Sequence, residues 1–213
     1  MKNTQILLNK ETLLPESLNS VLIGIMLGDG GIYRTSSTSN SRFEMSFGQH
    51  SQQFAEKIGD LFKNYMSNPV KAVKLEVRNK IYINYRLKTS TLPIFNQYHE
   101  MFYTLNLEKG KYVKKVPKDI LEFMDPIVLA YLLMSDGNFD KNRNRVRIYS
   151  NSFTKEDVQM LAEAINAKLG IYVGVLHDRK DQWILTIGAK QLDLLRQTVT
   201  SHFDPSMLYR LGL

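Results

Sequence analysis

"VLIGIMLGDGG" occupies residues 21–31, and a second apolar run, "PIVLAYLLMSDGNFD", occupies residues 126–140. Both runs reach an Asp-Gly pair, at Asp29 and Asp136, about half of the 213-residue chain apart. Such self-similarity at a long distance predicts an internal repeat.

The segments that follow the two Asp-Gly pairs come in the same order. Residues 42–50 and 144–150 alternate apolar and polar side chains, which predicts strands with one buried face. Amphipathic helices are expected over 51–66 and 153–170, with Thr154 as an N-cap, followed in each half by two strands and a closing helix at 91–105 or 190–203. The pattern predicts an α+β fold with two pseudo-symmetric halves, which we place at residues 1–115 and 116–213.

Composition excludes several kinds of site. The chain has no cysteine, which rules out disulfides, thiolate zinc sites and a cysteine nucleophile. Its four histidines are scattered, so a metal would have to be held by oxygen atoms. No apolar stretch is long enough to span a membrane, and the first residues do not resemble a signal peptide, so we expect neither membrane insertion nor secretion.

Positive charge favours a polyanionic partner. The formal net charge is +7 and the sequence pI is about 9.4. In the predicted strands, arginine, lysine and asparagine alternate with the apolar residues and therefore share the outward face. An ordinary solvated surface is the alternative, but this mixture suits phosphate contact and major-groove reading. The DNA-binding candidates are Arg34, Arg42, Glu44, Ser46, His50, Lys74, Arg78, Lys80, Asn84, Arg86, Lys88, Arg143, Arg145, Arg147, Tyr149, His177, Arg179 and Lys180.

Small residues in the two apolar runs predict that two helices pack closely. Gly24 and Gly28 would lie on one side of the first helix, and glycine in a helix interior costs about 1 kcal/mol relative to alanine. Asp125 and Pro126 suit the start of the second helix. Gly30 and Gly137 are expected to end the helices in the left-handed conformation.

A carboxylate at the C-terminal end of a helix is poorly placed for stability, because the helix dipole already makes that end negative. Each Asp-Gly read alone would be an ordinary turn. Two of them at equivalent places, Asp29 and Asp136, predict instead a site for a divalent cation, with Mg²⁺ preferred. Metal-assisted phosphodiester hydrolysis is the chemistry that such a pair of carboxylates serves.

The segments "LIGIMLGDG" (22–30) and "LAYLLMSDG" (129–137) resemble the signature helices of LAGLIDADG homing endonucleases, of the monomeric two-motif type encoded by mobile mitochondrial introns. The resemblance extends to "KKVP", "NSFTKEDV" and "SMLYRL" and covers nearly the whole chain. It implies saddle-shaped antiparallel sheets in the DNA major groove, a monomer in an organelle, and cleavage of both strands of a long asymmetric site with 3′ overhangs.

The same resemblance implies the site residues. Asp29 and Asp136 would bind Mg²⁺, which we expect Mn²⁺ to replace, together with the neighbouring Gly28 and Ser135. The basic active-site residues would be Lys114, with Lys115 as an alternative, and Arg210. Gln49 and Asn151 are weaker catalytic candidates. Two other functions stay open: an intron RNA maturase, and a DNA-binding relative that has lost catalysis.

Overall fold

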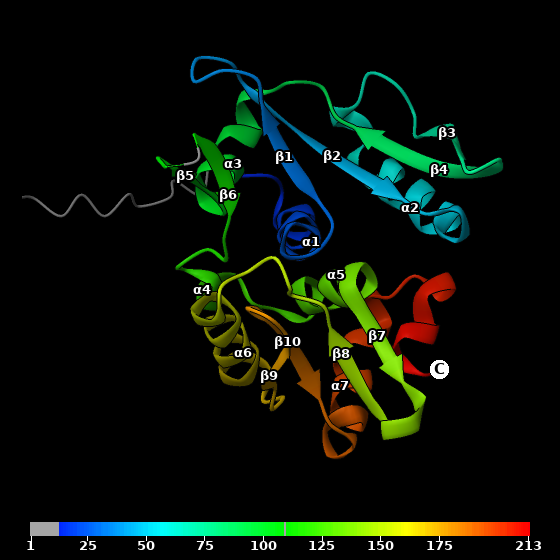
Figure 1. The fold of residues 1–213 in the computed structure, drawn as a ribbon, viewed down its shortest axis with the longest axis vertical. Helices are drawn as coiled ribbons and strands as arrows, with labels where there is room; N and C mark the ends of the chain where they lie inside the picture. Colours follow the sequence, from blue (N-terminus) through cyan, green and yellow to red (C-terminus); the bar gives the residue numbers. More distant parts are fainter. Residues whose placement is uncertain (1–12, 109) are drawn as a thin grey trace, which may run out of the picture.

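The computed structural model describes residues 13–108 and 110–213, and shows two similar halves that meet along two central helices (Figure 1). The prediction that the N-terminus is not a signal peptide concerns residues 1–12, which lie outside the described residues. The first half consists of α1 (Glu16–Leu27), β1 (Gly31–Arg34), β2 (Ser41–Phe47), η2 (Gln49–Ser51), α2 (Gln52–Phe62), η3 (Lys63–Tyr65), β3 (Lys71–Val77), β4 (Lys80–Lys88), η4 (Pro93–Phe95) and α3 (Asn96–Phe102).

A short hairpin leads from the first half to the second. It is formed by β5 (Tyr103–Asn106) and β6 (Lys111–Lys114). The second half consists of α4 (Ile120–Phe123), α5 (Pro126–Asp136), β7 (Gly137–Asp140), η5 (Lys141–Arg143), β8 (Arg145–Ile148), α6 (Lys155–Leu169), β9 (Gly174–Arg179), β10 (Gln182–Ile187), η6 (Ala189–Gln191), α7 (Leu192–Val199), η7 (Thr200–His202) and η8 (Pro205–Leu211). The expected helix over 91–105 is therefore shorter, since its last residues belong to β5.

Each half contains a four-stranded antiparallel sheet with the same connectivity. The strand orders are β1-β2-β4-β3 and β7-β8-β10-β9. The apolar residues that alternate in β2 and β8 are buried, as expected from the period of two. The α+β architecture with two pseudo-symmetric halves is confirmed, while the boundary at residue 115 stays a prediction.

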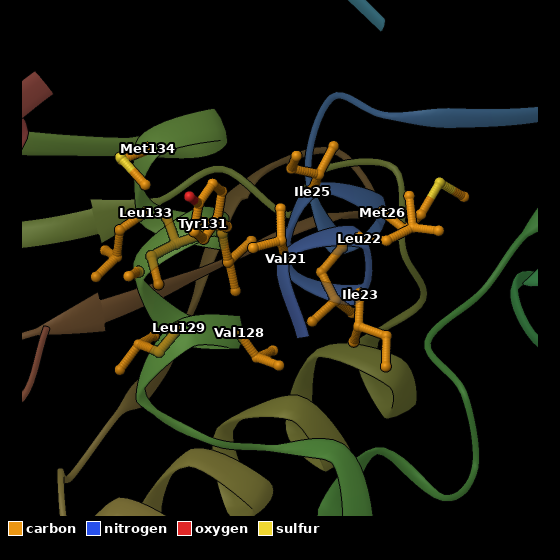
Figure 2. Close-up of a cluster of buried hydrophobic side chains, with 14 of the residues drawn as sticks. Val21, Leu22, Ile23, Ile25, Met26, Val128, Leu129, Tyr131, Leu133 and Met134 are labelled. Atoms are coloured by element: carbon orange, nitrogen blue, oxygen red, sulfur yellow. The ribbon is translucent and has the colours of Figure 1, made fainter. Parts of the chain in front are cut away.

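Helices α1 and α5 lie side by side in the centre of the molecule (Figure 1). Over residues 20–27 of α1 and 128–135 of α5 every residue is buried, as is expected where a helix is enclosed on all sides. Figure 2 shows Val21 of α1 beside Tyr131 of α5, whereas Met26 and Leu129 point away from the partner helix. The two helices thus form the junction between the halves and also contribute to the core of each half.

Close approach of the two helices requires glycine. A Cβ atom built on Gly24 would lie 2.5 Å from the carbonyl oxygen of Val128 and 2.8 Å from Cβ of Tyr131. At the start of α5, Asp125 accepts a hydrogen bond from the backbone N–H of Val128, and Pro126 is the first helical residue. The predicted packing and N-terminal cap are confirmed. In the described part of the chain, no helix is both long and apolar enough to cross a membrane.

The expected left-handed conformation of Gly30 and Gly137 was wrong. Gly137 is extended, with φ −74° and ψ 149°, and Gly30 does not have a positive φ angle. The helices do not end in isolated caps, because the chain continues almost at once into β1 and β7. Glycine is needed here for space: an added Cβ would meet Ile25 within 2.5 Å at Gly30 and the Leu133 carbonyl oxygen at 2.4 Å at Gly137.

Candidate active site and nucleic-acid face

The two aspartates meet where the central helices end. Asp29 lies in the turn between α1 and β1, and Asp136 is the last residue of α5. Their carboxyl groups are within hydrogen-bond reach of each other. Glycine at position 28 permits this approach, because an added Cβ would lie 2.4 Å from Cβ of Ser135 and 3.0 Å from Oδ2 of Asp136. The pattern of small residues therefore brings two carboxylates together across the pseudo-symmetry axis.

Both carboxyl groups are weaker acids than ordinary aspartates. Burial raises the pKa of Asp136 to about 7, and the nearby charge of Asp29 acts in the same direction. Partial burial also raises the pKa of Asp29. Lys114 and Arg210 oppose both shifts. Without a bound cation, the pair therefore tends to retain a proton, since two like charges at this distance repel.

Two basic side chains flank the carboxylates at equivalent positions. Lys114, at the end of β6, donates hydrogen bonds of 2.7 Å to the carbonyl oxygens of Gly28 and Gly30. Arg210, in η8, donates from Nη1 to the carbonyl oxygen of Gly137 over 2.5 Å. Gly30 and Gly137 each follow an active-site aspartate, so the two cations hold matching carbonyl groups. Burial lowers the pKa of Lys114 to about 8, although Asp136 and Asp29 oppose this change.

The donor set of this site fits a divalent cation. It offers two carboxylates and the carbonyl oxygen of Gly28, which already solvates the ammonium group of Lys114. The hydroxyl of Ser135 is buried and, among the described residues, has no hydrogen-bond partner. No group of three or more acidic, histidine or cysteine side chains gathers anywhere in residues 13–108 and 110–213. Few protein ligands, all of them oxygen, suit Mg²⁺, which keeps several of its water molecules.

The remaining catalytic candidates lie at the ends of strands. Gln49 is exposed in η2, just after β2. Asn151 follows β8 and donates from Nδ2 to Asp178 and Gln182. Neither side chain bonds to an aspartate of the site within the part of the chain that the structure describes. The backbone N–H of Lys115 donates to the Phe102 carbonyl and so fixes the end of the hairpin beside Lys114.

The outward face of the first sheet is a basic groove of about 780 Å³. Glu44 and Ser46 of β2 lie opposite Lys88 and Arg86 of β4 in the register, which places all four side chains on one face. Lys71 pairs with Arg86 and joins them, although it was not among the sequence-based candidates. The groove therefore combines cationic and hydrogen-bonding groups, as expected for contact with a nucleic acid.

On the outward face of the second sheet, the arginine side chains form ion pairs with an acidic residue. Arg145 and Arg147 of β8 both bind Oδ2 of Asp140, at 3.2 and 2.6 Å. Arg147 holds the pKa of Asp140 below its usual range through this hydrogen bond. Asp140 was not predicted from the sequence, because its partners are brought to it only by strand pairing. The other exposed candidates on loops and strand ends are His50, Arg78, Lys80, Arg143, Tyr149, Arg179 and Lys180.

The structure corrects the expected orientation of three candidates. Lys74 pairs with Ile83, on the face opposite to Arg86, because in β3 it is Val73 that shares the outward face with Asn84. His177 pairs with Trp183, whose ring lies 4.6 Å from the ammonium of Lys155 in α6. Arg34 donates from Nε to Ser39 and lies near Glu100 of α3. These three side chains point away from the basic face, because residues opposite each other in an antiparallel pair share a face.

A protein-family model described as the LAGLIDADG DNA endonuclease family matches residues 19–195. This chain belongs to that family. The matched range includes the segments 22–30 and 129–137, both four-stranded sheets, Asp29, Asp136 and Lys114, whereas Arg210 lies beyond it.

Curated relatives within the family have two kinds of name. The chain is 25% identical to "Cytochrome b mRNA maturase bI2" of Saccharomyces cerevisiae over 91% of its own length and 47% of that protein. It is 24% identical to "DNA endonuclease I-ChuI" of Chlamydomonas applanata, over 74% of this chain and 75% of that one. The chain thus spans about half the length of the yeast maturase.

Solved structures share the fold. The homing endonuclease I-WcaI bound to its DNA recognition sequence matches with a TM-score of 0.83 and 22% identity, covering 93% of this chain and 87% of that one. I-DmoI in complex with DNA and Mn matches with a TM-score of 0.53 and 17% identity, covering 87% and 97%. Another I-DmoI structure of this fold contains DNA and Ca. The LAGLIDADG fold with two halves is therefore shown for this chain.

Proposed function

We propose that the protein is a site-specific DNA endonuclease that makes a double-strand break in the presence of a divalent metal ion. The observation that carries this proposal is the pair of carboxyl groups, Asp29 and Asp136, in reach of each other at the junction of two sheets. Each half contributes one aspartate, one flanking cation and one basic face. This duplication suits a substrate with two strands, each of which is cut once.

Asp29 and Asp136 would hold Mg²⁺, with Gly28 and Ser135 beside them, and we expect Mn²⁺ to substitute. The bound ion would supply Lewis-acid stabilisation of the phosphate and a more acidic water molecule. Arg210 never loses its charge and so acts only electrostatically. Lys114, whose pKa burial lowers to about 8, can hold or release a proton near neutral pH. Gln49 and Asn151 are proposed to face the nucleic acid near the cut.

The sheets of the two halves would bind a long DNA target that is asymmetric because their side chains differ. We further propose 3′ overhangs, a monomeric enzyme and an organellar location for the intron-encoded gene. A relative in Mycosarcoma maydis is named as a probable intron-encoded DNA endonuclease, which supports the genetic context.

The test is cleavage of a randomised double-stranded DNA library in Mg²⁺, followed by sequencing of the ends. Wild type should cut both strands at one long site. Asp29→Asn and Asp136→Asn should each lower the cleavage rate by at least about a hundredfold, since each removes a charged metal ligand, and should leave DNA affinity within a few-fold. Undiminished cutting by both variants would contradict the assigned chemistry.

A second function, intron RNA binding as a maturase, is favoured by the similarity to the bI2 maturase, which covers 91% of this chain. Competition binding distinguishes the two: an intron RNA that displaces a DNA target at equal concentration would favour the maturase. The same two aspartate variants add a second measurement, because splicing assistance should survive the loss of metal ligands whereas DNA cleavage should not.

A further inference from the structure

Two arginines occupy equivalent positions in the two sheets. Counted from the active-site aspartates, Tyr33 and Asp140 are each the fourth residue beyond, in β1 and β7. Arg42 lies directly opposite Tyr33, and Arg145 lies directly opposite Asp140. The pseudo-symmetry therefore relates Arg42 to Arg145, and both stand on the outward face of their sheet.

Both arginines are held by a carboxylate in the same way. Nε of Arg42 donates to Oε1 of Glu44 over 2.5 Å, and Nε of Arg145 donates to Oδ2 of Asp140 over 3.2 Å. The carboxylates come from different places, since Glu44 is on the same strand as Arg42 while Asp140 is on the neighbouring strand. The same contact has thus been built by two different sequences.

Attachment through Nε leaves the two terminal nitrogens of each guanidinium for another partner. Within residues 13–108 and 110–213, neither Arg42 nor Arg145 makes a hydrogen bond through Nη1 or Nη2. These two atoms form the fork that matches O6 and N7 of guanine in the major groove. A side chain that is already fixed loses less conformational entropy when it binds.

The anchoring carboxylate also weakens contact with phosphate. Asp140 is 10% exposed and neutralises part of the charge of both Arg145 and Arg147, whose side chains are 18% and 26% exposed. A nearby negative charge opposes binding to any phosphate, whereas an oriented fork favours one base edge. This contrasts with Lys71 and Arg86, which line the groove and make no ion pair in the described part of the chain.

We propose that Arg42 and Arg145 determine base specificity, each oriented by its carboxylate to recognise guanine in the major groove. The proposal rests on the proposed function in so far as it takes duplex DNA as the ligand. Four residues of extended chain span at most about 13 Å, and base pairs rise about 3.4 Å, so each guanine should lie within about four base pairs of the nearer scissile phosphate. The two positions should be equally far from the centre of the target.

The experiment is selection of bound duplexes from a randomised library by the full chain in EDTA, so that binding is measured without cleavage. Wild type should enrich two guanines placed symmetrically about the centre. Arg145→Lys keeps the charge but removes the fork, and should reduce the preference at one guanine by about tenfold while leaving the other unchanged. Arg42→Lys should do the same at the other guanine.

A separate variant tests whether Asp140 positions Arg145. Asp140→Asn keeps the volume and an oxygen for the N–H of Arg143, yet removes the charge. It should weaken the preference at the Arg145 position and, at the same time, raise affinity for random-sequence DNA. Glu163→Gln removes the same charge from the exposed surface of α6 and should leave the base preference unchanged. Thermal unfolding of each variant identifies any general loss of structure.

Unchanged preferences in both lysine variants would overturn the proposal, as would an equal loss at every position of the target. Failure of this proposal can be distinguished from failure of the endonuclease proposal. If the wild-type protein selects the two guanines but never cuts in Mg²⁺, the endonuclease proposal is contradicted and guanine recognition by Arg42 and Arg145 is supported. If the protein cuts a target that has no guanine at either position, guanine recognition by Arg42 and Arg145 is contradicted and the endonuclease proposal is not.

Discussion

The carboxyl groups of Asp29 and Asp136 are held together at an energetic cost. The structure surrounds them with Lys114 and Arg210, yet burial still raises both pKa values. The folding free energy that enforces this proximity comes from the packed helices behind the site. Such a pair is expected to bind a cation more tightly than two separated carboxylates do, because the cation relieves their repulsion.

The burial and mutual repulsion of the two carboxyl groups predict how the stability of the protein depends on pH. The pKa of Asp136 is about 7 in the folded chain, against an ordinary value of 3.8. Between these values the folded state binds more protons, so the contribution of this group to stability is complete below about pH 4 and is lost as pH rises through about 7. In EDTA at pH 8, Asp136→Asn should therefore raise Tm by at least about 2–4 °C, since each 1 kcal/mol of relieved repulsion shifts Tm by about that much in a chain of this size.

Thermal unfolding of wild type and Asp136→Asn at pH 4 and pH 8 measures this difference. The gain should disappear at pH 4, where both proteins are neutral at this position. Glu163→Gln, a change of charge on the exposed surface of α6, serves as the control. A gain of equal size at both pH values would show that the repulsion is not its cause.

At the scale of the element, α1 and α5 depend on contact between their backbones. Gly24 permits it, because a side chain there would meet the Val128 carbonyl and Tyr131. Helix propensity alone would favour alanine by about 1 kcal/mol, so the observed glycine shows that interhelical packing outweighs propensity here. The same approach at Gly28 sets how close the aspartates lie.

Gly24→Ala should destabilise the protein by roughly 1–3 kcal/mol despite the better helix propensity, because the helices must move apart. Chemical denaturation measures the loss, and cleavage should fall as well, since the aspartates separate. Gly188→Ala is the matched control: it has a φ of −77° and no atom within 4 Å of the new Cβ. Equal stability of the two variants would refute close packing at Gly24.

At the scale of the whole molecule, the halves share one core. Buried side chains of α1 and α5 belong to one cluster that includes residues of both sheets. Polar contacts also cross the junction: Ser20 donates to Asp125 over 2.5 Å, and Lys57 lies 3.6 Å from Asp204. Neither half can expose its central helix without losing much of its buried apolar surface.

We therefore expect a single cooperative unfolding transition, in spite of the internal repeat. Calorimetry would show equal calorimetric and van't Hoff enthalpies, and circular dichroism and Trp183 fluorescence should give the same midpoint. Trp183 reports on the second half and far-ultraviolet circular dichroism on both halves. Two separate transitions would mean that the halves fold independently.

The sequence by itself determined the repeat, the buried helices, the faces of β2 and β8 and the two aspartates. Each of these is encoded in local periodicity or in a motif that occurs twice. Lys114 and Arg210 came from family resemblance, and the structure places both beside the aspartates. Their catalytic roles stay predictions.

Only the tertiary structure decided which face β3 presents, why Gly30 and Gly137 are glycines, and which carboxylate holds each arginine. The alternation in β3 is compatible with either face, and the register with β4 turns Val73 outward. Asp140 and Arg145 are separated by a turn and become partners only through strand pairing. Such contacts depend on how elements are placed against one another, and local sequence patterns carry no information about that placement.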